Sequence, residues 1–144
     1  MFERILIPVD GSRPSRNAAS HAIDLAAEQG ATIHALYVIE PVAVTEGGTG
    51  QVHEAMRESG ESIVAELKEQ AEAKDVTAIT DVETGVAHRE ILEYAEGNDI
   101  DLIVMGTHGR TGLGRYLLGS VTEKIVRISD IPVLTVRPGD EEEE

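Results

Sequence analysis

A glycine-rich segment in the last third of the chain is the part of the sequence best suited to bind a ligand. Four glycines fall within nine residues, and a Gly-Ser pair follows; they are Gly106, Gly109, Gly112, Gly114, Gly119 and Ser120. Glycine has no Cβ, so such a segment can adopt left-handed conformations and approach a ligand closely. Its N–H groups, with those of a following helix, are suited to hold phosphate oxygens. The spacing indicates a phosphate-binding loop, although a glycine-rich turn without a ligand has the same composition.

The charge of this segment is opposite to that of the chain. The 144 residues include 27 Asp and Glu against 12 Lys and Arg, a formal net charge of −15. Between Gly106 and Arg127 the balance is locally +3, because Glu123 is the only acid among the bases Arg110, Arg115, Lys124 and Arg127. This reversal favours an anionic ligand at the segment.

Two common nucleotide fingerprints do not fit the segment. Gly114 to Ser120 reads G-x-x-x-x-G-S and lacks the lysine of a P-loop, and Gly109 to Gly114 reads G-x-x-G-x-G, the reverse of the dinucleotide order. The glycines instead follow the pattern G-x-x-G, nine residues, then G-[S/T].

The elements around the segment alternate between strand-like and helix-like patterns. Four nearly continuous apolar runs, at residues 5–9, 33–39, 102–105 and 133–136, are typical of strands covered on both faces in a parallel sheet. The run at 76–82 alternates apolar and polar residues and predicts an edge strand. Strand–helix alternation predicts a three-layer α/β/α sandwich with a five-stranded parallel sheet. Ligands of such sheets bind beyond the carboxyl ends of the strands, here after the first, second and fourth.

Helical periodicity fills the gaps between these runs. In the first helix Ser12 is the expected N-cap, Pro14 lies in the first turn and Gly30 stops the helix. The inward positions expected in the three later helices are Val52, Met56, Ile63, Leu67 and Ala71, then Ala87, Ile91, Leu92 and Ala95, then Leu117, Leu118, Val121, Ile125 and Ile128.

Composition excludes several classes of function. Cysteine is absent, so no disulfide framework or thiol nucleophile exists. Without the acidic end from Asp140 to Glu144, 22 acids still face 12 bases, so nucleic acid is not an expected partner. The apolar runs are too short for a membrane span, and the N-terminus does not resemble a secretion signal. We therefore expect a cytoplasmic protein with one domain at 1–139 and a disordered tail at 140–144. Its acidic, lysine-poor composition is compatible with a halophilic, salt-rich cytosol.

Four segments together resemble the ATP-binding branch of the universal stress protein family. They are Ile5 to Ser12 (ILIPVDGS), Met105 to Gly112 (MGTHGRTG), Leu118 to Lys124 (LGSVTEK) and Ile131 to Val136 (IPVLTV), and the resemblance runs from about Phe2 to Arg137. It implies the strand order 3-2-1-4-5 of the universal-stress-protein and adenine nucleotide alpha hydrolase-like fold.

The resemblance also implies site residues. Pro8, Val9, Asp10 and Val38 would form the adenine pocket, with the main chain of Val38 against the adenine edge and Asp10 near the ribose or a nucleotide-bound Mg²⁺. The residues expected around the phosphates are Gly106, Thr107, His108, Gly109, Arg110, Thr111 and Gly112, and those closing the pocket are Gly119, Ser120, Val121 and Thr122. The ligand would be ATP, or ADP or AMP, with Mg²⁺ or Mn²⁺.

Three functions follow from these patterns. The first is a regulatory protein of the stress response that binds ATP and hydrolyses it slowly at most, because no P-loop lysine or placed general base is evident. His108 is expected to position rather than catalyse, and the histidines show no metal-ligand spacing. The second is an adenylating or ATP-hydrolysing enzyme of the same fold, but residues 9–14 (VDGSRP) lack the S-G-G-x-D-S loop, and no H-I-G-H pair occurs. The third is a scaffold that forms a homodimer by pairing the edge strand Val133–Val136 across a two-fold axis, as the family does.

Overall fold

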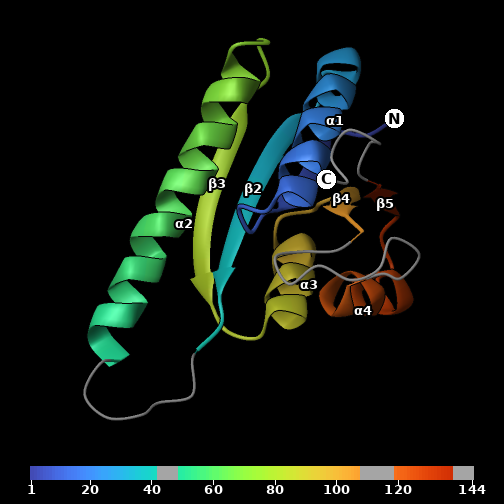
Figure 1. The fold of residues 1–144 in the computed structure, drawn as a ribbon. Coiled ribbons are helices and arrows are strands. Elements are labelled where there is room, and N and C mark those ends of the chain that lie inside the picture. The colour runs from blue at the N-terminus through green and yellow to red at the C-terminus, as the bar shows by residue number, and fades with distance from the viewer. Residues whose placement is uncertain (42–48, 108–118, 138–144) are drawn as a thin grey trace.

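Five parallel strands form one sheet in the order β3-β2-β1-β4-β5, which confirms the predicted architecture (Figure 1). The computed structural model describes residues 1–41, 49–107 and 119–137. The strands are β1 (Arg4–Pro8), β2 (Thr32–Ile39), β3 (Ala78–Thr84), β4 (Leu102–Gly106) and β5 (Val133–Val136). The helices are α1 (Arg13–Gln29), α2 (Thr49–Glu72), α3 (Ala87–Gly97) and α4 (Ser120–Ile128).

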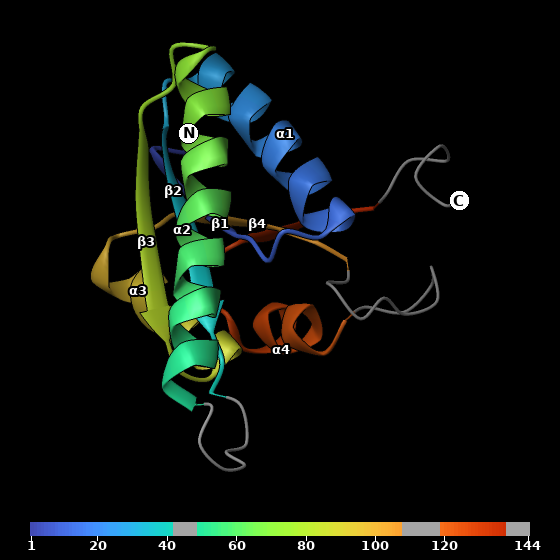
Figure 2. The same cartoon turned by 60° about the vertical axis from the view of Figure 1, so that its left-hand side comes forward.

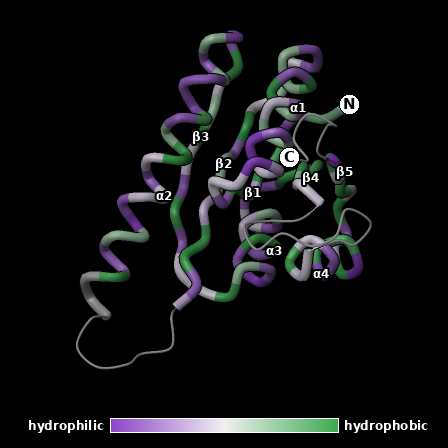
Figure 3. The backbone as a smooth tube through the Cα atoms, in the orientation of Figure 1, coloured by the Kyte–Doolittle hydropathy of each residue, from purple (hydrophilic) through white to green (hydrophobic). Residues whose placement is uncertain are grey.

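Two helices cover each face of the sheet. Helices α1 and α2 lie on one face and α3 and α4 on the other, as the turned view shows (Figure 2). The core is split accordingly: Ile5, Ile7, Ile33 and Val104 belong to the α1/α2 side, and Leu6, Leu36 and Ile103 to the α3/α4 side. Hydrophobic colour follows the inner strands in Figure 3, whereas the turns of α2 alternate between hydrophilic and hydrophobic residues.

The first helix begins and ends where the sequence predicts. Ser12 is the N-cap, and its hydroxyl oxygen accepts a hydrogen bond from the N–H of Ser15 at 3.3 Å. Gly30 ends the helix in the left-handed conformation, with φ of 70°, which glycine adopts without steric cost. Both ends of α1 are therefore set by local sequence.

Three local predictions are corrected. The third strand begins at Ala78 rather than at Val76, because the N–H of Val76 closes the end of α2 on the carbonyl of Ala71. Val52 and Ile128 were expected to face inward but are 46% and 50% exposed. Val52 lies in the part of α2 that extends beyond the sheet, and Ile128 is the last residue of α4 (Figure 1).

Helix α2 lies close to β2 at one glycine. A Cβ at Gly60 would meet the ring of Tyr37, with Cε2 at 2.8 Å and Cγ at 2.9 Å. Tyr37 is 4% exposed, so the ring has little room to move away. The absence of a side chain at Gly60 therefore lets the buried ring pack directly on the helix.

Candidate functional site

A cavity of about 320 Å³ opens at the carboxyl ends of β1, β2 and β4, between α3 and α4. This is the edge of a parallel sheet at which ligands bind, and the volume suits a small molecule. The residues that line it are Pro8, Val9, Asp10, Ser15, Leu36, Val38, Glu40, Ala87, Ile91, Met105, Gly106, Gly119, Ser120, Val121 and Thr122.

On the side of β1, the main chain of Val38 has no strand partner at this cavity. The N–H of Thr32 donates to the carbonyl of Glu3, and the carbonyl of Leu36 accepts from the N–H of Val9, so both groups of β2 point toward the side of β1. Main-chain direction alternates along a strand, so the N–H and carbonyl of Val38 point the same way. The pairing of β1 with β2 ends at Pro8 and Leu36. Within the described residues no hydrogen bond is found for the Val38 main chain on that side, which leaves one donor and one acceptor side by side.

Alternate side chains of β2 form one wall of the cavity, and α3 forms the next. Leu36 and Val38 of β2, and Glu40 directly after the strand, follow a spacing of two and therefore share a face. The carboxylate oxygen Oε2 of Glu40 accepts a hydrogen bond from the N–H of Ala87 at 2.8 Å. Since Ala87 is the first residue of α3, this bond fixes the start of that helix against the end of β2.

The turn after β1 places Asp10 at the cavity. Its Oδ1 accepts from the N–H of Ser12 at 2.9 Å, and its own N–H donates to the hydroxyl oxygen of Ser15 at 3.1 Å. Asp10 thus shapes the turn that leads into α1 and also lines the cavity. Asp10 therefore has a structural role in the turn besides its position at the cavity.

Strand β4 and helix α4 are joined by bonds around the described ends of the glycine-rich segment. The N–H of Gly119 donates to the carbonyl of Thr107 at 2.6 Å, and the hydroxyl of Thr122 donates to the carbonyl of Gly106 at 2.9 Å. The N–H of Thr107 donates to the carbonyl of Val136 at 3.2 Å. These bonds hold the start of α4 beside the end of β4.

The start of α4 offers main-chain donors to the cavity. Gly119 is the N-cap and cannot cap the helix with a side chain. The first N–H groups of a helix have no partner within the helix, and those of Ser120, Val121 and Thr122 receive none from the rest of the described chain. All three residues line the cavity. Free donors at the positive end of the helix dipole favour an anion there.

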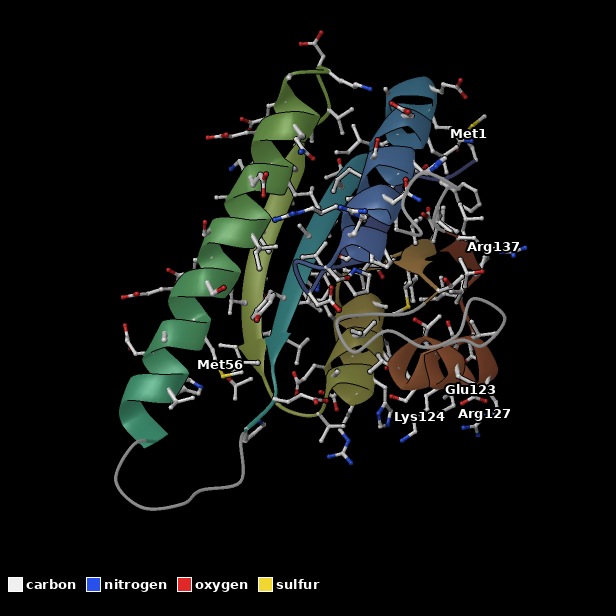
Figure 4. The ribbon with its side chains drawn as sticks, in the orientation of Figure 1. Met1, Met56, Glu123, Lys124, Arg127 and Arg137 are labelled. Carbon is white, nitrogen blue, oxygen red and sulfur yellow. The ribbon has the colours of Figure 1, made fainter. Side chains whose placement is uncertain are left out.

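The bases of α4 do not supply the positive charge that the sequence suggested. Arg127 pairs with Glu123 through Nε and Oε2 at 3.0 Å, on the outward side of the helix (Figure 4). Lys124 is exposed on the same outward side and does not line the cavity. Of the bases counted in the local +3, Arg110 and Arg115 lie outside the described residues. In the described part, attraction of an anion therefore rests on main-chain N–H groups.

Most of the described site residues predicted from the sequence are brought together. Those that line the cavity are Pro8, Val9, Asp10, Val38, Gly106, Gly119, Ser120, Val121 and Thr122. Thr107 does not line it and instead joins the loop ends through its main chain. Those that lie outside the described residues are His108, Gly109, Arg110, Thr111 and Gly112.

Sequence reasoning missed six residues that line the cavity: Ser15, Leu36, Glu40, Ala87, Ile91 and Met105. The spacing of two around Val38 could have identified Leu36 and Glu40, and the helical spacing of four joins Ala87 to Ile91. Met105, the last residue of the apolar run at 102–105, is 6% exposed and serves both the core and the cavity wall.

A buried polar pair lies beneath this wall. His34, two residues before Leu36, is 5% exposed, and its Nδ1 is 2.8 Å from the hydroxyl oxygen of Tyr94 in α3. Burial, and secondarily the charge of Arg4, lowers the pKa of His34 below its ordinary value. Burial first, with the carboxylates of Asp81 and Glu83, raises the pKa of Tyr94 to about 12. Both residues are therefore neutral at pH 7 and link β2 to α3.

The described residues contain no group of three His, Asp or Glu side chains arranged to hold a metal ion. None of the helices described in the structure is long and apolar enough to cross a membrane.

Known proteins resemble this chain in sequence and in fold. The chain is 40% identical over 141 residues to universal stress protein MJ0531 of Methanocaldococcus jannaschii, covering 95% of this chain and 83% of that protein. It is 36% identical to universal stress protein YxiE of Bacillus subtilis, covering 95% and 100%. The solved structure of MJ0577 of M. jannaschii superposes with a TM-score of 0.90 at 29% identity, covering 97% and 99%.

More distant structures of the same fold hold nucleotides. A universal stress protein in complex with cAMP superposes with a TM-score of 0.76 at 23% identity, covering 96% of this chain and 99% of that one. A family protein from Arabidopsis thaliana with AMP bound superposes with a TM-score of 0.75 at 15% identity, covering 99% and 95%. The model of the universal stress protein family matches residues 1–137. This chain belongs to the universal stress protein family.

Proposed function

We propose that the protein binds an adenine nucleotide in the cavity at the carboxyl ends of β1, β2 and β4. ATP is the nucleotide that we propose first. The observation that carries the proposal is the placement of two complementary features in one cavity. Within the described residues, the main-chain N–H and carbonyl of Val38 have no partner on the β1 side and suit a base, and the first N–H groups of α4 have none either and suit phosphates. Two proteins of the same fold hold AMP or cAMP.

The Val38 edge fits adenine in particular. Adenine carries a ring nitrogen acceptor beside an exocyclic amino donor, which pairs with one main-chain N–H and one carbonyl. Val38 and Val121, which are half-buried and line the cavity, supply apolar surface for the ring. At the other end, Ser120 would add its hydroxyl to the N–H groups of α4, and Asp10 would lie near the ribose or a metal ion carried by the nucleotide.

The proposed role is regulatory binding in a cytoplasmic stress response, with slow hydrolysis at most. The carboxylates that line the cavity are those of Asp10 and Glu40, and each already accepts a main-chain hydrogen bond. Neither is held as a free general base. We further propose a homodimer formed through β5, whose outer edge pairs with no strand in the described chain.

The test begins with protein purified without added nucleotide. It is denatured, and the released small molecules are identified by mass spectrometry; calorimetry with ATP then measures affinity. Adenine nucleotide released from the protein, or saturable ATP binding, is the expected result. Absence of both would overturn the proposal, and rapid release of phosphate or pyrophosphate would favour an enzyme instead.

A further inference from the structure

We propose that Glu40 makes the site selective for purines with an amino group at position 6, an inference that rests on the proposed binding of an adenine nucleotide. Glu40 directly follows β2, two residues after Val38, and its side chain lines the cavity on the same face as that of Val38. In this role, the carboxylate of Glu40 recognises the base as a second hydrogen-bond acceptor beside the carbonyl of Val38.

The direction of β2 decides which part of the base faces Glu40. Within one strand residue the carbonyl lies nearer the carboxyl end than the N–H does. An adenine whose ring nitrogen accepts from the N–H of Val38 therefore donates its amino group to the carbonyl on the Glu40 side. This holds whether N1 or N7 of the base is the acceptor, because the amino group lies beside both. The second hydrogen of the amino group then needs another acceptor.

Glu40 is held at the cavity wall by a hydrogen bond that uses one of its two oxygens. Its Oε2 accepts from the N–H of Ala87 at 2.8 Å, which fixes the side chain against the cavity wall. An ionised carboxylate has acceptor capacity on both oxygens, so Oε1 can face the base. A main chain with one donor and one acceptor can also pair with a 6-oxopurine in a shifted register. The carboxylate adds the preference for the amino group.

Substitution of Glu40 by Gln keeps the hydrogen bond from the N–H of Ala87 but changes the group that faces the base. The N–H of Ala87 requires an acceptor, so the amide oxygen of Gln would face Ala87 and its NH₂ group would face the base. Two donors would then oppose each other in the ATP complex. Loss of a negative charge near the nucleotide would affect ATP and inosine 5′-triphosphate alike, so the ratio of their dissociation constants isolates base recognition.

The experiment measures Kd for ATP and inosine 5′-triphosphate by calorimetry in three proteins. The wild type is expected to prefer ATP, and Glu40→Gln to lower that preference about tenfold, the effect of one hydrogen bond to a charged acceptor. Glu93→Gln, at an exposed position of α3 outside the cavity, should keep the wild-type ratio. An unchanged ratio in Glu40→Gln would overturn the role of Glu40.

A measurement on the wild type covers the case in which Glu40→Gln does not fold. N6-methyl-ATP keeps one amino hydrogen for Val38 and loses the one assigned to Glu40, so it should bind about tenfold more weakly than ATP. Equal binding would contradict the inference. If the wild type binds no ATP, both the proposed function and the role of Glu40 are wrong. If the wild type binds ATP but does not prefer it to inosine 5′-triphosphate, only the role of Glu40 is wrong.

Discussion

The hydroxyl of Thr122 in the first turn of α4 donates a 2.9 Å hydrogen bond to the carbonyl of Gly106 at the end of β4, and Thr122 is 4% exposed. The two residues are 16 apart in the sequence, and the glycine-rich segment runs between them. This bond fixes the α4 donors relative to the sheet, so the site depends on a contact that need not touch the ligand.

Replacement of Thr122 by Val should weaken both the fold and the site. Valine has nearly the same shape but leaves the carbonyl of Gly106 without its side-chain donor, which costs about 1–3 kcal/mol for a buried group. Urea denaturation should show this loss, and calorimetry should show weaker ATP binding. Thr122→Ser keeps the hydroxyl and should retain most of the ATP affinity; equal behaviour of the two variants would contradict the role of the bond.

Gly106 is required by packing against α1. A Cβ at this position would lie 2.8 Å from the carbonyl oxygen of Pro14 and 2.9 Å from its carbonyl carbon. Gly106→Ala should therefore lower the free energy of unfolding by about 1–3 kcal/mol, the usual cost of overpacking.

Gly97 provides the matched control for that substitution. A Cβ at Gly97 meets nothing within 4 Å, and the residue ends α3. Gly97→Ala should leave stability unchanged or raise it by up to about 1 kcal/mol, because alanine favours a helix. Denaturation of the two variants under one condition tests the prediction, and equal destabilisation would show that the Pro14 contact is not the cause.

The pair of His34 and Tyr94 predicts a loss of stability at mildly acidic pH. The pKa of His34 is lowered in the folded state by burial, from an ordinary value of 6.5. Below that value the unfolded chain binds a proton that the folded chain excludes, so stability is full above about pH 6.5 and falls as the pH decreases. The free energy of unfolding should therefore be lower at about pH 5.5 than at about pH 7.5.

A double substitution isolates this contribution. His34→Leu with Tyr94→Phe removes the histidine together with the hydroxyl that it contacts, so no buried polar group is left unpaired. Its stability should change less between the two pH values than that of the wild type. His21→Gln, on the exposed side of α1, should keep the wild-type dependence. If the double variant keeps the pH dependence of the wild type as well, the pair of His34 and Tyr94 does not cause that dependence.

The features that could be read from the sequence are those set by local patterns. Apolar runs, the Ser12 cap and the Gly30 stop depend on adjacent residues, and the predicted site residues follow strand ends that must meet at one sheet edge. Glu40 was missed because a carboxylate after a strand looks like ordinary surface until its bond to Ala87, 47 residues away, is seen. The outward position of Arg127 and its pairing with Glu123 could not be foreseen either, because a charge count along the chain does not show which side of a helix a side chain takes.

The outer edge of β5 provides the last prediction, that of the dimer. Leu134 is 43% exposed on this strand, and Val126 and Ile128 of the neighbouring α4 are 44% and 50% exposed. An unpaired edge strand with exposed apolar side chains favours association with another chain. Leu134→Arg should therefore convert a dimer to monomer in light scattering.

The opposite edge of the sheet supplies the control for the dimer. Ile79 of β3 is 46% exposed, much like Leu134, but lies on the other edge strand. Ile79→Arg adds the same charge to a similar apolar position, so it should leave the dimer intact if β5 forms the interface. Dissociation by Ile79→Arg alone would place the interface at β3, and a monomeric wild type would exclude both edges. Because each substitution changes one edge and leaves the cavity untouched, ATP affinity measured on the same samples also shows whether nucleotide binding requires the dimer.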